Sequence, residues 1–215
     1  MRTREMTSLS REPATDFLFD LDGGRACLDF ANTLSSTSGE HLHGYADLVA
    51  FAEQSELITQ AEADWLHAAS ALNSAEVEAV MARAYRLRSA VYAVFSAIAA
   101  DQPVAQAELE ALNRELGLAL QHACVEWQPL GDGYHYGWNG RELDMPLWGV
   151  ARSAAEVLVS HEDRLRVREC GGDDCHWLFI DTSRNRSRQW CSMASCGNRQ
   201  KAKRHYQRSR LRTRT

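Results

Sequence analysis

The sequence predicts an α+β protein: a mostly helical N-terminal domain with a small β hairpin or sheet, followed by a C-terminal module in which a β-hairpin and a helix surround four cysteines. Three observations predict it. Apolar residues recur every three or four positions through most of the first 160 residues, two equally spaced cysteine pairs lie in the last quarter, and charge divides sharply between these regions. A chain of 215 residues suffices for one medium domain with a small appendage.

Composition places the chain among globular proteins that bury a core. Hydrophobic residues make up 45% and charged residues 25%, which excludes wholesale disorder, collagen and coiled-coil architectures. The longest nearly apolar run, Ala90–Ala100, is much shorter than the roughly 20 residues that cross a bilayer. The N-terminus leads into polar sequence and lacks the apolar core of a signal peptide. We therefore expect a cytoplasmic protein with no membrane partner.

The N-terminal domain is expected over residues 17–162, after a disordered lead-in over residues 1–16. Residues 17–24 predict a short strand closed by a glycine turn, and residues 25–33 a helical turn. Apolar spacing predicts helices over residues 45–57 and 146–159, and a long helix that follows Ser74. The capping box Thr59–Glu62 predicts the start of another helix. Pro103 is expected in the first turn of the helix that comes after the long one. Aromatic segments flanking Gly131-Asp-Gly133 predict a β-hairpin.

Four of the six cysteines form two pairs, Cys170-x4-Cys175 and Cys191-x4-Cys196, with 15 residues between them. Zn²⁺ is satisfied by four thiolates at tetrahedral corners, and two loops can supply these in pairs. Residues 176–181 predict a strand, residues 188–191 a returning strand, and a helix begins beside Cys196. We expect a treble-clef-like zinc finger over residues 163–210; two disulfides or four buried thiols are the alternative. Cys27 and Cys124 are expected to be small buried hydrophobes.

Charge marks this finger as a separate electrostatic object. Residues 1–163 hold 10 Lys and Arg against 25 Asp and Glu, whereas residues 164–215, including the basic tail 211–215, hold 14 against 4. Nearly all of the 14 are arginines, whose planar fork suits phosphate and guanine edges. DNA is therefore the expected partner. The acidic domain would be repelled by DNA, so it should sit away from the duplex or fold back and mask the finger.

Two stretches carry the expected DNA contacts. Arginines alternate through the turn between the cysteine pairs, which would project them to one face, and basic residues follow on the helix after Cys196. The complete set is Arg184, Arg186, Arg188, Asn198, Arg199, Lys201, Lys203, Arg204, His205 and Arg208. The alternative is a solvated basic helix that binds polyanions without specificity or packs on the acidic domain.

Two motifs resemble known families. Cys170-x4-Cys175-His-Trp-Leu-Phe-Ile-Asp-Thr-Ser, Trp190-Cys-Ser-Met and Cys196-Gly-Asn-Arg-x-Lys-Ala-Lys-Arg-His look like the CGNR zinc finger. Gly23-Gly-Arg-Ala-Cys-Leu-Asp-Phe-Ala-Asn-Thr33 is similar to the ABATE domain that precedes that finger. The resemblance implies a bacterial stress-responsive transcriptional regulator whose finger binds DNA. Its N-terminal domain would then sense a small-molecule effector or form a homodimer.

Candidate ligand groups in the N-terminal domain are few. Asp29 and Asn32, at i and i+3, could hold a ligand, or could cap or hydrogen-bond the glycine turn. His41-x-His43 could bind a metal or be a solvated pair, and Asp22-Gly-Gly-Arg25 is too short for a phosphate cradle. No catalytic constellation is recognisable, so the expectation is that the protein is not an enzyme.

Other functions stay open at this point. The N-terminal domain could be a small-molecule-binding or enzymatic module, with the finger as a structural or protein-interaction element. The finger could also be a thiol redox sensor, in which oxidation of the cysteines releases the metal.

Overall fold

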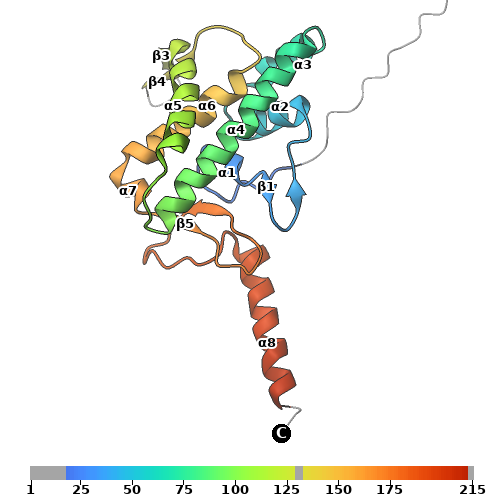
Figure 1. The fold of residues 1–215 in the computed structure, drawn as a ribbon, viewed down its shortest axis with the longest axis vertical. Coiled ribbons are helices and arrows are strands. Elements are labelled where there is room, and N and C mark those ends of the chain that lie inside the picture. The colour runs from blue at the N-terminus through green and yellow to red at the C-terminus, as the bar shows by residue number, and fades with distance from the viewer. Residues whose placement is uncertain (1–17, 129–132, 213–215) are drawn as a thin grey trace, which may run out of the picture.

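A 26-residue helix, α4 (Ser74–Ala99), runs through the centre of the N-terminal domain (Figure 1). It belongs to a computed structural model that describes residues 18–128 and 133–212, including the side chains of residues 18–127 and 133–206. Helices α1 (Ala26–Ala31), α5 (Gln106–Gln121) and α6 (Met145–Val159) pack around it. The side chains that α4 buries follow the expected helical spacing and include Val80, Ala84, Leu87, Val91, Val94 and Phe95.

Two shorter helices, α2 (Tyr45–Gln54) and α3 (Gln60–Ser70), pack against each other beside α4. The predicted capping box is confirmed at the start of α3. The Glu62 carboxylate accepts a hydrogen bond from the Thr59 backbone N–H at 2.7 Å, and the Thr59 hydroxyl accepts one from the Glu62 N–H at 3.3 Å. Helix α3 therefore begins where its sequence signal places it.

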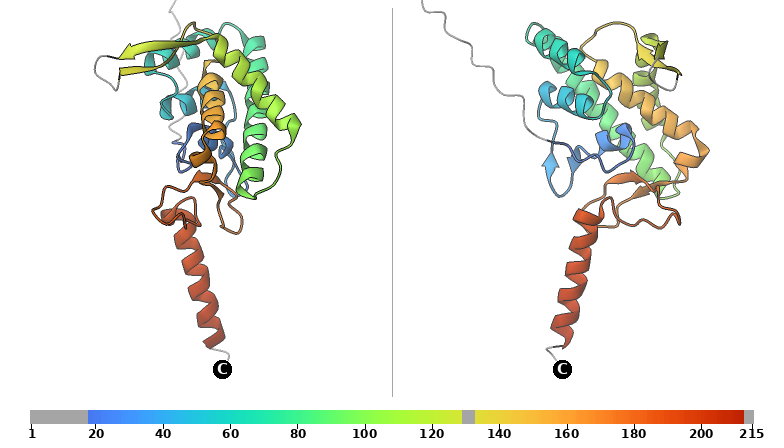
Figure 2. Two further views of the ribbon diagram at one scale, coloured as in Figure 1. Left: turned by 90° about the vertical axis from the view of Figure 1, so that its left-hand side faces the viewer. Right: turned by 180° about the vertical axis from the view of Figure 1, so that it is seen from behind.

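The expected hairpin is confirmed in strands β3 (Ala123–Gln128) and β4 (Gly133–Trp138), which pair antiparallel with Ala123 opposite Trp138. It extends sideways from the helices at the end of the molecule remote from the C-terminus (Figure 2). Most of the expected Gly131-Asp-Gly133 turn lies outside the described residues. A second, very short ribbon joins β1 (Leu34–Ser35) to β2 (Gly39–Glu40).

Two local expectations for the N-terminal domain are wrong. Residues 18–20 are not a strand, because the Gln54 side-chain amide takes the backbone bonds of Phe19: its Nε2 donates to the Phe19 carbonyl at 2.6 Å and its Oε1 accepts from the Phe19 N–H at 2.8 Å. Pro103 is not in the first turn of a helix, because α5 begins only at Gln106. The proline lies in the connection between α4 and α5, where the chain reverses direction. The expected disordered lead-in, residues 1–16, falls outside the described residues.

The C-terminal part begins with α7 (His161–Arg164) and continues through β5 (Val167–Glu169), β6 (Leu178–Ile180), the single π-helical turn η1 (Met193–Gly197) and α8 (Asn198–Arg212). The expected return strand at residues 188–191 is absent. Strand β6 pairs instead with β5, with Val167 opposite Ile180. Both apolar side chains are buried in the main core, whereas the apolar side chains of the segment containing Arg188, Trp190 and Cys191, pack in the cysteine cluster.

Strand β6 joins the two parts of the protein because its side chains alternate between two cores. Leu178 and Ile180 lie in the main core of the N-terminal domain, whereas Phe179 packs with the four cysteines. Helix α8 projects away from the rest of the molecule (Figures 1 and 2). In the part of the chain that the structure describes, no helix is both long and apolar enough to span a bilayer.

Candidate metal centre and basic helix

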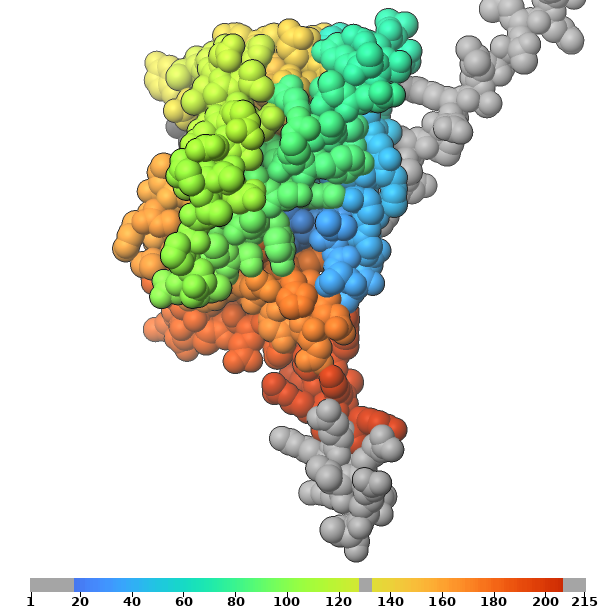
Figure 3. Space-filling model, viewed as in Figure 1, coloured from blue at the N-terminus to red at the C-terminus, as the bar shows by residue number. Residues whose placement is uncertain are grey.

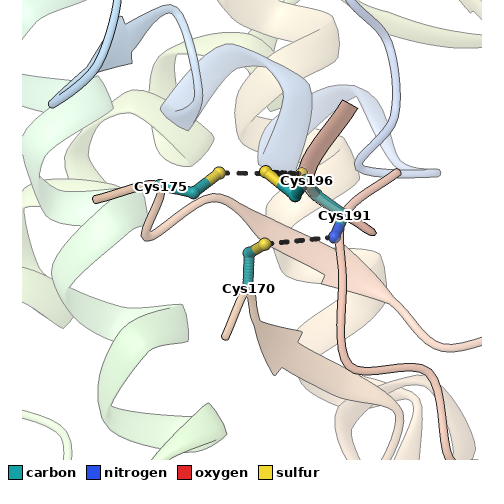
Figure 4. Close-up of side chains that lie close together, drawn as sticks. All are labelled: Cys170, Cys175, Cys191 and Cys196. Carbon is teal, nitrogen blue, oxygen red and sulfur yellow. Dashed lines mark hydrogen bonds between the residues drawn. The ribbon is translucent and has the colours of Figure 1, made fainter. Parts of the chain in front are cut away.

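The four paired cysteines meet at one buried point (Figure 4). All four Sγ atoms lie within 4.8 Å of one another, with Cys175 and Cys191 at 3.6 Å and Cys191 and Cys196 at 3.7 Å. Thiolates at the corners of a tetrahedron with metal–sulfur bonds of about 2.3 Å, the zinc value, would lie about 3.8 Å apart. A disulfide would place them at about 2.05 Å. The cysteines are unpaired, and their spacing fits a tetrahedral metal ion.

The first two ligands come from the loop that connects β5 to β6. The Cys170 N–H donates to the Trp177 carbonyl at 2.8 Å, and the Cys175 N–H donates to the Gly172 carbonyl at 3.1 Å, which closes a tight knuckle. A Cβ on Gly172 would lie 3.2 Å from the Cys175 Cβ, 3.4 Å from the Cys196 Sγ and 3.6 Å from the Cys170 Sγ. The backbone of Gly172 therefore forms part of the wall around the sulfurs.

The other two ligands lie just before the start of the C-terminal helix. Cys191 follows an extended loop, and Cys196 lies in η1, one residue before Gly197. A Cβ on Gly197 would lie 2.7 Å from the Met193 sulfur, so this turn leaves little room for a side chain. Helix α8 begins at the next residue, and its first turn is anchored directly to the metal centre.

Arg188 braces the second ligand loop. Its guanidinium stacks over the Phe179 ring, 4.5 Å from the centroid, and its Nε donates to the Trp190 carbonyl at 2.8 Å. It also donates to the carbonyls of Cys191 and Asp22. The expectation that the alternating arginines of this turn all face DNA is therefore corrected for Arg188. Arg184 and Arg186 are exposed, but Arg188 folds inward and is partly buried.

Asp181 fixes the turn that carries these arginines. Its buried carboxylate accepts hydrogen bonds from the backbone N–H groups of Ser183 at 2.9 Å and Arg188 at 3.0 Å. Burial raises the pKa of the Asp181 carboxyl, but hydrogen bonds from Ser183 and Arg188 outweigh this effect, so the net pKa is lowered. The group is therefore a carboxylate near neutral pH.

Crowding of the sulfurs makes their proton affinities unequal. Hydrogen bonds from Cys175 and Cys191 lower the pKa of Cys170 to about 2, whereas the neighbouring Cys170 and Cys175 raise the pKa of Cys191. Without a cation, thiolates this close cannot all be ionised, because each anion disfavours the next. A dication would remove that conflict. The chemistry of the donor set thus fits a metal ion held by Cys170, Cys175, Cys191 and Cys196. Four protein ligands fill every position of a tetrahedral ion, which is typical of structural metal sites.

Asp29 and Asn32 form the joint between the two parts of the protein. The Asp29 carboxylate accepts a hydrogen bond from the Gly23 N–H at 2.7 Å, and the Gly23 carbonyl accepts one from the Ile180 N–H at 2.9 Å. The Asn32 amide bonds both backbone groups of Leu178. The Asp29 contact matches the alternative of a buried hydrogen bond to the glycine turn, whereas Asn32 bonds β6 and not that turn. Both residues also line a cavity of about 260 Å³, so ligand binding there stays a prediction.

The histidine pair does not gather into a metal site. The His41 Nε2 lies 2.7 Å from the Ser38 hydroxyl, and His43 is exposed. Within the described residues, the four cysteines are the one group of three or more His, Cys, Asp and Glu side chains placed to hold a metal. Cys27 is fully buried, as expected, whereas Cys124 is only partly buried on β3. Burial raises the pKa of the Cys27 thiol to about 12, so this thiol stays protonated.

Helix α8 carries the basic residues in an exposed arrangement. It contains seven Lys and Arg and no Asp or Glu, and the side chains of Arg199, Lys201 and Arg204 are exposed. Lys203 forms an ion pair with Asp173 of the first knuckle. Asn198 is exposed, and its amide also donates to the Ala194 carbonyl at 3.3 Å. His205 is exposed, and the side chain of Arg208 lies outside those described.

The fold and site define a zinc-finger protein in which a helical domain precedes a four-cysteine metal centre and a basic helix. Residues 166–209 match the model of the CGNR zinc finger. Residues 24–161 match the model of the ABATE family, described as a putative stress-induced transcription regulator. The second match covers more than half of the chain, so the protein belongs to the ABATE family. Among curated proteins there is no match to the chain.

Proposed function

We propose that this protein is a zinc-dependent transcription regulator that binds DNA through α8, and that it acts by binding and not as an enzyme. The metal in the four-cysteine centre is Zn²⁺, which accepts four thiolates at tetrahedral corners without a ligand-field penalty. The family to which the chain belongs supports a regulatory role in stress. The exposed basic residues of α8 support the DNA contact itself.

The observation that carries the proposal is a long basic helix whose described side chains are nearly all exposed. A helix that is polar on every side has no apolar face that must pack against the rest of its protein. Its 15 residues extend for about 22 Å, and a major groove about 12 Å wide admits an α-helix. Arg199 and Arg204 are then positioned to neutralise phosphates or reach guanine edges.

The arrangement of charge favours the same interface. The acidic residues belong mainly to the region before residue 164, and α8 points away from the body that this region forms (Figure 3). A duplex bound along α8 would therefore lie at a distance from most of the negative charge. This supports the expectation that the acidic domain sits away from DNA, and it disfavours masking of the helix by that domain.

Lys203 and Arg188 have different roles in this proposal. Lys203 can contact a phosphate only by leaving or sharing its ion pair with Asp173. Arg188 is a positioning residue, because its guanidinium is engaged by the finger itself. The exposed residues Arg184, Arg186, Arg199, Lys201 and Arg204, together with the exposed Asn198 and His205, form the remaining candidate DNA surface.

Selection of genomic DNA fragments tests the proposal directly. The zinc-loaded full chain would be compared with a chain that ends at Gln200, which keeps all four cysteines and lacks most of α8. We expect the full chain to enrich fragments with a common sequence and the shortened chain to enrich none. Equal enrichment by both chains, or no enrichment by the full chain, would reject α8 as the DNA contact.

A further inference from the structure

One side of the β3–β4 hairpin is apolar and exposed to solvent. Val125 lies opposite Tyr136 and Trp127 lies opposite Tyr134, and residues paired across antiparallel strands share one side of the sheet. These four side chains, which we call the aromatic face, belong to residues that are each between 57% and 76% exposed. The Trp127 and Tyr134 rings lie with their centroids 5.0 Å apart and so form a continuous surface.

The opposite side of the hairpin carries its charged groups. Glu126 is paired with His135 across the strands, and their side chains approach to 3.6 Å. The Glu126 side chain also lies across Gly137, where it leaves no room for a Cβ. The two sides of the hairpin therefore differ sharply, because the described residues of the aromatic face bear no charge.

The base of the hairpin is held by α6 of its own chain. Trp138 is partly buried, with its ring centroid 5.7 Å from that of Trp148. The Arg152 guanidinium lies 5.3 Å from the centroid of the Tyr136 ring. Beyond this base the hairpin extends sideways from the helices (Figure 2). A two-stranded hairpin is marginally stable in water, so further packing on the aromatic face would stabilise it.

The area of the aromatic face suits a weak protein contact. Exposed apolar clusters on soluble proteins mark interaction sites, and Trp and Tyr contribute most to binding at such interfaces. Aromatic side chains this exposed supply roughly 100–150 Å² each, so the face offers on the order of 400 Å². With a polar rim, two such faces would bury roughly 1,000 Å², which is the lower limit for a specific interface. The contact should therefore be reversible.

Charge favours a second copy of this chain as the partner. Residues 1–163 hold 25 Asp and Glu against 10 Lys and Arg, so two copies repel each other over most of this surface. An uncharged face is where they can approach, whereas a basic partner would be drawn to the acidic surface instead. Arg152 and Glu156, 3.2 Å apart beside the face, add one charge of each sign to its rim. A twofold contact requires such a self-complementary patch.

We propose that the aromatic face joins two copies of the chain in a weak, reversible homodimer, in which Trp127 and Tyr134 of one copy pack on the same face of the other. A homodimer is one of the two roles that the sequence resemblance implies for the N-terminal domain, and the hairpin supplies its surface. The hairpin lies at the end of the molecule remote from the C-terminus, so this contact leaves α8 uncovered in each copy (Figure 2). The dimer does not depend on the proposed DNA contact.

Sedimentation equilibrium of the zinc-loaded full chain measures this association without DNA. Between about 1 and about 300 µM, the weight-average mass should rise from that of one chain toward that of two, because an interface this small holds with a micromolar or weaker dissociation constant. A mass that stays at one chain at the highest concentration would overturn the proposal, and the aromatic face would then serve a different partner or none.

Two neighbouring substitutions place the contact on this face. Tyr134→Lys puts a charge within the aromatic face, so a dimer would bring two like charges together, and the dissociation constant should rise at least about tenfold. The matched control, His135→Lys, adds a charge at the next residue, on the opposite side beside Glu126, and should leave the dissociation constant unchanged. Equal weakening in both variants, or none in Tyr134→Lys, would overturn the proposal.

Opposite charges distinguish a twofold contact from a misfolded hairpin. Tyr134→Glu alone should associate as weakly as Tyr134→Lys, for the same reason. An equimolar mixture of the two variants should form dimers again, because opposite charges then face each other. Misfolded hairpins would not recover on mixing. A mixture that stays monomeric where the unaltered chain is dimeric would contradict the twofold contact.

Discussion

Asn32 holds Leu178 by both ends of its side-chain amide: Nδ2 donates to the Leu178 carbonyl at 2.9 Å, and the Leu178 N–H donates to Oδ1 at 2.8 Å. The amide thus replaces a neighbouring strand along the free edge of β6. Asn32, which belongs to the motif Gly23–Thr33, therefore fixes strand β6, which follows the first cysteine pair. The orientation of the metal centre on the helical domain depends on this contact.

Replacing Asn32 with alanine should therefore destabilise the whole protein. Asn32→Ala leaves the buried N–H and carbonyl of Leu178 without partners, at a cost of about 2–5 kcal/mol for the two groups. Urea unfolding monitored by circular dichroism measures the change. Asn113→Ala, an exposed asparagine on α5, should change the free energy of unfolding by less than about 0.5 kcal/mol. Similar values for the two variants would show that the amide contact contributes little.

Arg188 should control the lifetime of the bound metal. Arg188→Lys keeps the charge but loses the flat stack on Phe179 and the Nε bond to Trp190, which together position Cys191. We expect metal transfer to a chromogenic chelator to be roughly tenfold faster or more, as for other groups that orient metal ligands. The matched control is Arg186→Lys, because Arg186 is exposed in the same turn. Equal transfer rates for these two variants would contradict the bracing role.

A side chain at Gly172 should weaken metal binding. Gly172→Ala would place a methyl group 3.2 Å from the Cys175 Cβ, which is tighter than an ordinary contact, and Cys175 can shift little because the metal holds its sulfur. Metal affinity, measured by competition with a chelator, should fall by about tenfold or more. At Gly117 an added Cβ meets nothing within 4 Å, so Gly117→Ala should leave the affinity unchanged. A Gly172→Ala protein with normal affinity would show that the knuckle is wider than the structure indicates.

Asp29 should make stability depend on pH. Burial raises the pKa of its carboxyl to about 7, with the Gly23 hydrogen bond opposing and the charge of Asp22 adding to the shift. In the unfolded chain the pKa is about 3.9. Between these values the folded protein binds a proton that the unfolded chain does not, so the contribution of Asp29 to stability falls as pH rises from about 4 to about 7.

Asp29→Asn removes that titration. The measured quantity is the free energy of unfolding of the variant minus that of the unaltered protein. This difference should rise by a few kcal/mol between about pH 4 and pH 7, because one pKa unit corresponds to about 1.4 kcal/mol. Above about pH 7 it should stay constant. The cysteines titrate in both proteins, so the difference isolates Asp29. A difference that does not change with pH would contradict the raised pKa.

Local sequence signals located most of the elements. The helical spacing before residue 100, the Thr59–Glu62 capping box and the equal cysteine spacing are short-range patterns, and the structure confirms each of them. The partner of β6 was missed because both β5 and the segment at Arg188 lie within reach along the chain. Burial against the N-terminal core decides between them, and that is a long-range property.

The inward roles of arginine were harder to predict. Arg188 belongs to an alternating series that looks solvent-exposed, and nothing in that spacing marks one member as a brace. Arg88 did leave a signal. It follows Ala84 by four residues on the buried stripe of α4, where an arginine requires a buried partner. That partner, Glu40, lies far away in the chain and cannot be read from helical spacing.

DNA affinity measured as a function of salt tests the central claim most directly. Three exposed residues of α8 would be changed together, Arg199→Gln, Lys201→Gln and Arg204→Gln, and compared with Arg86→Gln, Arg114→Gln and Arg141→Gln, three exposed arginines of the N-terminal domain. Both triple variants lose the same charge. We predict that the α8 variant binds more weakly and that its log–log salt slope is shallower by about 0.9 for each lost phosphate contact, whereas the control variant keeps the original slope. Equal slopes for the two triple variants would contradict DNA binding through α8.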